Sequence, residues 1–190
     1  MRFPVMNIRL PDWVEQFMGE AGESFPNVED RMGLAVALSR RNVEEKTGGP
    51  FAAAVFDGEG KLIAPGVNMV TSSNCSVLHA EIVAVALAQN VLGRYDIGDA
   101  GRLDFDLVAT TEPCAMCFGA VPWSGVNRLI CGARDADARA IGFDEGPKLS
   151  SWVAELESRG ITVVRDVLRQ PAVDVLQTYL TSGGTIYNTG

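Results

Sequence analysis

Apolar and polar positions follow two different periods in the first half of the chain. Asn27 precedes a segment (28–46) whose apolar residues recur at helical spacing, and a second segment (78–92) does the same. Between them, the apolar runs "FAAAVFD" (51–57) and "LIAPGVN" (62–68) flank the turn residues "DGEGK". This pattern predicts a helix, a buried β-hairpin and a second long helix.

The second half alternates single strands with helices. A loop rich in Asp, Arg and Gly is predicted from residue 134 through "GFDEGP" (142–147). The remaining pattern predicts strands at 104–110, 128–133 and 161–167, and helices at 12–20, from about Cys114, at 150–160 and at 170–183. Five strands interleaved with helices predict an α/β fold, a three-layer α/β/α sandwich with a mixed sheet.

No clear linker or internal repeat interrupts this pattern. We therefore expect one domain over residues 1–190, with an N-terminal helical extension (about 1–26) and a C-terminal helix and tail (about 171–190). No stretch approaches the roughly 18 consecutive apolar residues of a membrane span. The opening residues lack the apolar core of a signal peptide, so we expect a cytoplasmic protein without membrane contact.

The net charge of −8 narrows the class of ligand. Affinity for nucleic acids depends on Lys and Arg contacts with phosphates, so an acidic chain is a poor candidate for that role. We expect no nucleic-acid partner and a small ligand that is neutral or cationic.

Candidate chemistry begins with Cys114 and Cys117, at C-x-x-C spacing where a helix is predicted to start. A helix N-terminus favours thiolates, and two thiolates at this spacing can bind one zinc ion. A structural or redox pair has the same spacing. Of the other cysteines, Cys131 lies in an apolar strand and is expected to be a core residue, whereas Cys75 is an alternative fourth ligand.

The single histidine, His79, supplies the third candidate ligand at the start of another predicted helix. Three protein ligands leave one zinc position open for water, whose pKa falls toward about 7. Glu81, two residues further on, is placed to accept the proton of that water. The combined pattern, H-A-E followed by P-C-x-x-C, is typical of zinc nucleobase deaminases.

The segments "GGPFAAAVFD", "VNMVTSSN", "HAEIVAV", "EPCAMCFGAV" and "ICGARDADA" give the chain a family resemblance over about residues 28–165. The chain resembles the purine-acting branch of the cytidine-deaminase-like superfamily, which includes bacterial guanine deaminases and tRNA adenosine deaminases. This resemblance implies a five-stranded sheet between helices, one zinc ion per chain and a homodimer.

The segment "ARAIGFDEGP" is similar to guanine deaminases, in which its acidic residue is a second proton shuttle. That position is Glu145, and the resemblance further assigns substrate contacts to Phe51, Asn68, Ala80 and Trp123. The chain differs from many members in having Ala52 in place of Gly and Glu145 in place of Asp.

The resemblance implies hydrolysis of guanine to xanthine and ammonia, and the longer Glu145 leaves the triazine ammeline as a second substrate. Two alternatives stay open at this point. One is another nucleobase or nucleoside deaminase, including a tRNA adenosine deaminase. The other is a non-catalytic zinc module with a deaminase-like fold.

Overall fold

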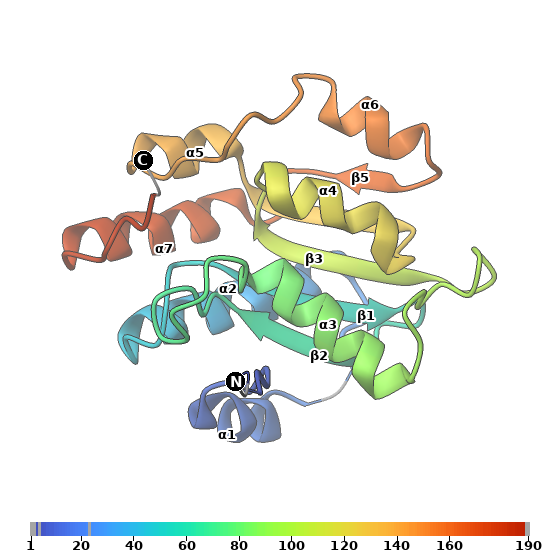
Figure 1. Cartoon of the computed structure of the whole chain (residues 1–190), viewed down its shortest axis with the longest axis horizontal. Coiled ribbons are helices and arrows are strands. Elements are labelled where there is room, and N and C mark those ends of the chain that lie inside the picture. Colours follow the sequence, from blue (N-terminus) through green and yellow to red (C-terminus); the bar gives the residue numbers. More distant parts are fainter. Residues whose placement is uncertain (1–2, 4, 23, 189–190) are drawn as a thin grey trace.

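Five strands form one mixed sheet in the computed structural model of the chain, which describes residues 3, 5–22 and 24–188. The sheet order is β2-β1-β3-β4-β5, with β1 antiparallel to both neighbours and β3, β4 and β5 parallel (Figure 1). The predicted hairpin and the predicted mixed sheet are both confirmed. The strands are β1 (Ala52–Asp57), β2 (Leu62–Val67), β3 (Phe105–Thr111), β4 (Arg128–Ala133) and β5 (Thr162–Val164).

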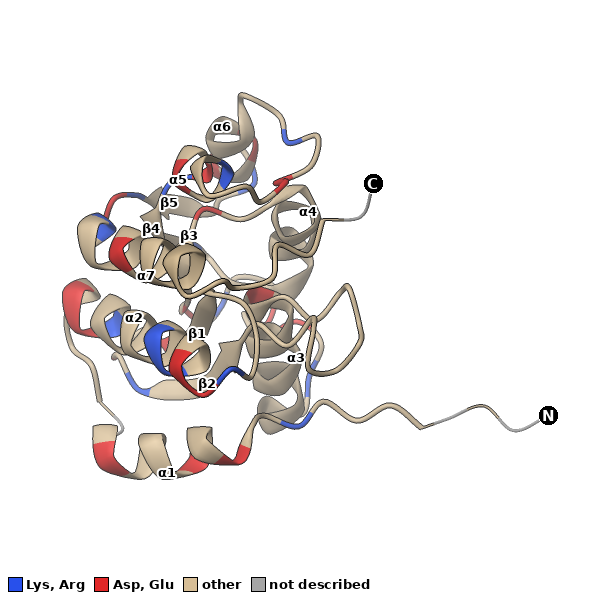
Figure 2. Ribbon diagram, turned by 90° about the vertical axis from the view of Figure 1, so that its left-hand side faces the viewer, with Lys and Arg blue, Asp and Glu red and all other residues tan. Residues whose placement is uncertain are grey.

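Helices cover both faces of this sheet, which gives three layers in side view (Figure 2). One layer contains α2 and α7, and the opposite layer contains α3, α4 and α6. None of the described helices combines the length and the apolar character needed to cross a membrane. The helices are α1 (Asp12–Ala21), α2 (Val28–Glu44), α3 (Ala80–Leu92), α4 (Ala115–Ser124), α5 (Asp135–Ala140), α6 (Trp152–Glu157) and α7 (Arg169–Thr181).

The sequence of strand β1 is apolar because both faces of the strand are buried. Ala52, Ala54 and Phe56 belong to the core under α2 and α7, whereas Ala53 and Val55 belong to the core under α3 and α4. Successive side chains of a strand point to opposite faces, so a central strand covered on both faces has no solvent-facing position.

The start of α2 is fixed by the predicted cap. The side chain of Asn27 accepts a hydrogen bond from the backbone N–H of Asp30 at 2.8 Å. Such a cap stabilises a helix by about 1 kcal/mol because it satisfies one of the free N–H groups of the first turn.

Three expectations for the second half need correction. Residues 135–140 form α5 where a loop was predicted, because Asp137 accepts a hydrogen bond from the Arg134 backbone N–H at 2.8 Å and so closes the first turn. Strand β5 and helix α6 are shorter than predicted. Helix α7 packs on its own sheet, with Val175 and Leu176 in the core. The terminal extensions remain predictions, and residues 1–2, 4, 23, 189 and 190 lie outside the described residues.

The first turn of α3 lies unusually close to β2. A Cβ atom at Gly66 would stand 2.3 Å from the carbonyl oxygen of Ala80 and 2.5 Å from the backbone nitrogen of Ala84. Real Cβ atoms do not approach so closely, so the absence of a side chain at Gly66 sets the distance between this helix and the sheet.

Candidate active site

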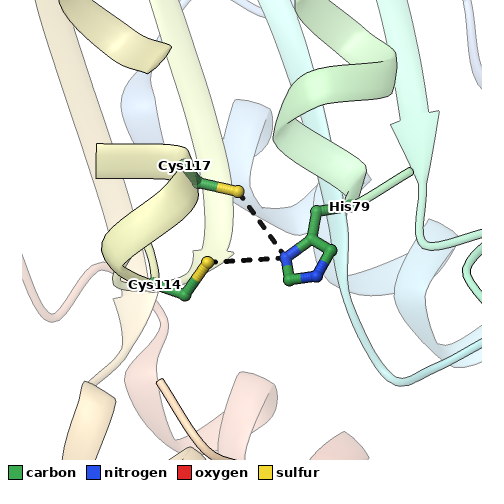
Figure 3. Close-up of side chains that lie close together, drawn as sticks. All are labelled: His79, Cys114 and Cys117. Carbon is green, nitrogen blue, oxygen red and sulfur yellow. Dashed lines mark hydrogen bonds between the residues drawn. The ribbon is translucent and has the colours of Figure 1, made fainter. Parts of the chain in front are cut away.

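The three predicted metal ligands lie where two helices begin on the same face of the sheet. His79 is the N-cap residue of α3, and Cys114 is the N-cap residue of α4, with Cys117 in the first turn (Figure 3). Neither side chain caps its own helix, and the two side chains face each other.

The geometry of these side chains fits one zinc ion. The Nδ1 atom of His79 lies 3.5 Å from the Sγ of Cys114 and 3.6 Å from the Sγ of Cys117 (Figure 3). Tetrahedral zinc with N and S ligands at their usual bond lengths separates those ligands by roughly 3.6 Å. Among the described residues, neither Cys75 nor Cys131 joins this cluster, and Cys131 is fully buried in the core as predicted.

Hydrogen bonds within the cluster perturb the thiols. The bond with Cys117, together with the bond to His79, lowers the pKa of Cys114 to about 4 despite its burial. The same Cys114–Cys117 bond and burial raise the pKa of Cys117 far above its usual value. For His79, burial disfavours the protonated ring, but the contact with Cys114 and the charge of Glu81 outweigh it and raise the pKa. The cluster therefore holds a thiolate, the ligand form that zinc requires.

Four acidic residues line the cavity that includes His79 and Cys114, and two of them have raised pKa values. Glu81 lies in the first turn of α3, and burial followed by the negative charge of Cys114 raises its pKa. Glu145, only 6% exposed, comes from the loop before α6, and the same two causes raise its pKa to about 8. Both groups therefore hold a proton more readily than surface carboxyls do.

The cavity has a volume of about 410 Å³ and narrows to buried polar atoms that have no partner among the described residues. These atoms are the Nδ2 of Asn68, the Oγ1 of Thr111 and the hydroxyl of Tyr187. The Oδ1 of Asn68, in contrast, accepts bonds from the N–H groups of Gly49 (3.2 Å) and Val70 (3.3 Å), which fixes the amide with its NH₂ group free. Unpartnered buried polar atoms in a cavity indicate a polar ligand.

Aromatic rings form the apolar wall of this cavity. Phe51 lines it as predicted and packs edge-to-face on Phe143, with ring centroids 4.9 Å apart. Phe143 in turn contacts Tyr187 at 5.0 Å between centroids. A flat, partly apolar ligand would be enclosed by this set of rings.

Two predicted contact residues are not brought to the cavity by their side chains. Trp123 is 81% exposed and does not line the cavity, because it stands two residues after the buried Val121 and so on the opposite face of α4. The side chain of Ala80 packs in the core below α3. The backbone N–H of Ala80, in the first turn of the helix, is the group of this residue that can still bind a ligand. The substrate-binding role of Ala80 therefore stays a prediction.

Sequence reasoning missed several cavity residues, namely Thr111, Phe143, Tyr187 and Asn188. Thr111 is close in sequence to Cys114, and Phe143 is close to Glu145. Their nearness to these motifs could have predicted that they reach the cavity. Tyr187 and Asn188 belong to the segment after α7, where no periodic pattern exists. Asn188 is held there by the Nδ2 bond that it donates to the carbonyl of Gly142 (2.8 Å).

Comparison with known proteins places these features in context. Residues 26–133 match the family described as cytidine and deoxycytidylate deaminase zinc-binding region. The guanine deaminase of Bacillus subtilis (strain 168) is 38% identical over 119 residues, which cover 63% of this chain and 72% of that protein. The solved guanine deaminase of Nitrosomonas europaea is 46% identical, with a TM-score of 0.88 and coverage of 93% and 97%. A structure in complex with 2,6-diaminopurine is 47% identical, with a TM-score of 0.88 and 96% of each chain covered.

Proposed function

The chain belongs to the cytidine and deoxycytidylate deaminase family, and on this basis we propose that it hydrolyses guanine to xanthine and ammonia. It is a zinc-dependent aminohydrolase by its family and by its relatives. The observation that carries the substrate assignment is Glu145, a second buried carboxyl in the cavity that contains Glu81 and the metal ligands.

His79, Cys114 and Cys117 would hold the zinc ion. When bound, zinc supplies a Lewis acid that lowers the pKa of a water ligand to about 7. Glu81 accepts a proton from the attacking water and passes it to a ring nitrogen of the base. Burial and the negative charge of Cys114 raise the pKa of Glu81, which makes the group a better proton acceptor than a surface carboxylate.

Glu145 protonates the departing amino group. Hydrolysis forms a C–O bond at the purine C2 atom and breaks the C–N bond to the exocyclic amine, which is a poor leaving group until it gains a proton. Burial raises the pKa of Glu145 to about 8, so the carboxyl carries that proton at neutral pH. Guanine would lie between the aromatic rings, with the free Nδ2 of Asn68 and the hydroxyl of Thr111 at its polar edge.

The charge of the cavity argues against a tRNA substrate. Four acidic residues line it, and no Lys or Arg does so among the described residues. Basic and acidic side chains are interspersed on the ribbon elsewhere (Figure 2). An RNA loop would bring phosphates to this mouth without partners to neutralise them. A non-catalytic zinc module would have no use for two buried carboxyls beside the metal.

An ammonia-release assay tests this proposal. The panel is guanine, adenine, cytosine, cytidine, guanosine, ammeline and a tRNA anticodon stem-loop. We expect guanine to be the best substrate and the stem-loop to be inert. We also expect Glu145→Gln to lower kcat on guanine by about 10²-fold or more while zinc content stays at one per chain. Faster turnover of the stem-loop, or full guanine activity in Glu145→Gln, would overturn the assignment.

We propose that the chain forms a homodimer in the cytoplasm. Exposed apolar side chains gather on α3, on α4 and just beyond α3, and they support an interface there: Val91, Tyr95, Met116 and Trp123. The four free cysteines, with no disulfide among the described residues, support the reducing compartment. Light scattering at micromolar concentration tests the dimer, and a 20.3 kDa species alone would contradict it.

A further inference from the structure

Lys148 is buried in a place that the catalytic scheme does not use. Its side chain is only 4% exposed, and it is not among the residues that line the cavity. Burial of an ammonium group costs free energy unless hydrogen bonds and charges compensate it. The partners of this ammonium group therefore indicate what the buried charge does.

Those partners join two loops that both reach the metal cluster. The Nζ of Lys148 donates to the carbonyl of Pro113 at 2.9 Å, and Pro113 immediately precedes Cys114. Along its own chain, Lys148 follows Glu145 by three residues, and its backbone N–H bonds to the carbonyl of Gly146 at 2.9 Å. One side chain thus bridges the loop of the second carboxyl and the turn of a metal ligand.

The rest of the ammonium environment compensates its charge. The Nζ lies 3.5 Å from the carboxylate of Asp135 and 5.0 Å from the ring centroid of Trp152. Asp135 is itself anchored, since its backbone N–H donates to Glu112 at 3.0 Å. The ammonium group is therefore held from three directions, and it has little freedom to move with either loop alone.

A second hydrogen bond completes the bridge on the cavity side. The backbone N–H of Ala115 donates to the carbonyl of Glu145 at 2.9 Å. Two bonds therefore cross between the loops, one from the backbone after Cys114 and one from Lys148 to the backbone before it. If the Lys148 bond were lost, only the backbone bond would remain between these two loops among the contacts described, while Arg139 would still hold the outer side of the Glu145 loop.

We propose that Lys148 is a positioning residue for deamination, whose ammonium group clamps the Glu145 loop to the Pro113–Cys114 turn. This inference rests on the proposed function of Glu145. It assigns Lys148 no contact with the substrate, because the side chain lies outside the cavity. A misplacement of about 1 Å at a reacting group can cost roughly 10²-fold in rate, so a clamp of this kind has a measurable effect.

Lys148→Met tests the clamp, since methionine keeps an unbranched apolar chain and removes the ammonium group. We expect kcat on guanine to fall by about 10- to 100-fold with KM within about threefold of wild type, because orientation is lost and the binding walls remain. The zinc content should stay at one per chain. Hydrogen–deuterium exchange at the Ala115 amide should become at least about tenfold faster, with or without zinc.

Arg128→Met is the matched control. Arg128 also pairs with a buried carboxyl group, since its Nη2 lies 2.5 Å from Asp106, but that pair is at the other end of β3 and does not contact the Glu145 loop among the contacts described. We expect it to lower stability while leaving kcat and Ala115 exchange near wild type. If Lys148→Met does not fold, Lys148→Gln, which keeps a shorter donor, should show a smaller fall in kcat and the same faster exchange.

The clamp is refuted if the folded Lys148 variants keep wild-type kcat and wild-type Ala115 exchange, or if Arg128→Met changes both as much as Lys148→Met. A failure of the proposed function looks different. In that case the wild type does not release ammonia from guanine, while the exchange rates still report whether Lys148 holds the two loops together.

Discussion

The two ends of β3 bury acidic side chains in opposite ways. Near its start, Asp106 is 3% exposed and is bonded by Arg31, whose own side chain is 3% exposed, and by Arg128 at 2.5 and 2.8 Å. Beyond its other end, Glu81 and Glu145 share a cavity whose described lining residues include no Lys or Arg. The same strand thus joins a compensated end, where two guanidinium groups pair with Asp106, to an uncompensated end, where Glu81 and Glu145 form no salt bridge among the described residues.

This difference distinguishes a buried carboxyl that stabilises the fold from a buried carboxyl that can transfer a proton. At Asp106 two guanidinium groups offset the cost of dehydrating the charge, and their hydrogen bonds hold the carboxyl group in place. At Glu145 burial outweighs the opposing charge of Lys148 and raises the pKa to about 8, so the carboxyl keeps a proton that it can transfer. A buried carboxyl keeps its proton at neutral pH where the nearby positive charge does not outweigh burial.

Glu81→Gln should have the largest effect, at the uncompensated end. We expect kcat on guanine to fall by about 10²- to 10⁴-fold because the proton acceptor is lost. The free energy of unfolding should not decrease, since a neutral amide of the same shape replaces a carboxyl whose pKa burial already raises. Ammonia release and urea unfolding measure the two quantities, with zinc content as the control. Turnover within a few-fold of wild type would contradict the role of Glu81.

Asp106→Asn, at the compensated end, should lower stability and leave turnover unchanged, which is the converse of Glu81→Gln. It leaves the Arg31 guanidinium buried without a negative partner, and such a loss typically destabilises a protein by about 3–5 kcal/mol. Urea unfolding measures that loss. Turnover per folded, zinc-loaded molecule should equal wild type, because the cluster lies at the far end of the strand. An unchanged free energy of unfolding would show that this ion pair is not structural.

The next largest effect should be in the pH dependence of the free energy of unfolding, to which Glu145 contributes. Since the pKa of Glu145 is raised on folding, its stabilising contribution is fully present below the unfolded pKa of about 4.5 and is lost as pH rises through about 8. Glu145→Gln should remove a decline on the order of a few kcal/mol over that window. Urea unfolding at half-unit intervals from pH 5 to 9 measures it, and parallel curves for the two proteins would rule out the shift.

Arg128→Gln should have the smallest effect. Arg128 is 36% exposed, and Arg31 still neutralises Asp106 when it is removed. We expect a loss of about 1 kcal/mol, as for partly exposed ion pairs. Urea unfolding beside Asp106→Asn measures the difference, and equal losses in the two variants would mean that Arg128 is the essential partner.

The metal ligands could be predicted from the sequence because each depends on local structure. His79 and Cys114 were placed at helix starts by apolar periodicity, and a helix start fixes the direction of the side chain. Glu145 and Asn68 were reached through resemblance, and the structure puts both on the cavity. Local patterns and motif matches therefore identified the residues of the metal cluster and much of the cavity.

The remaining cavity residues depend on tertiary packing. Tyr187 reaches the cavity because the chain turns back after α7, where the Tyr179 hydroxyl donates to the carbonyl of Thr185 at 2.7 Å. No periodicity marks that return. The exposure of Trp123 was equally hidden, since α4 is apolar on both sides and its sequence does not reveal which side faces the sheet. A short helix such as α5 depends on a single capping bond and is too short to show a periodic pattern in the sequence.

The close approach at Gly66 links the interior of the sheet to the choice of metal. The carbonyl of Ala80, which would collide with a methyl group there, is one residue from His79 and lies on the same helical turn as Glu81. Metal–ligand distances tolerate deviations of only about 0.2 Å, so a displacement of α3 by even part of an ångström would alter selectivity among divalent ions. The lack of a side chain at Gly66 on β2 thus sets the position of α3 and, through it, the distances among the metal ligands.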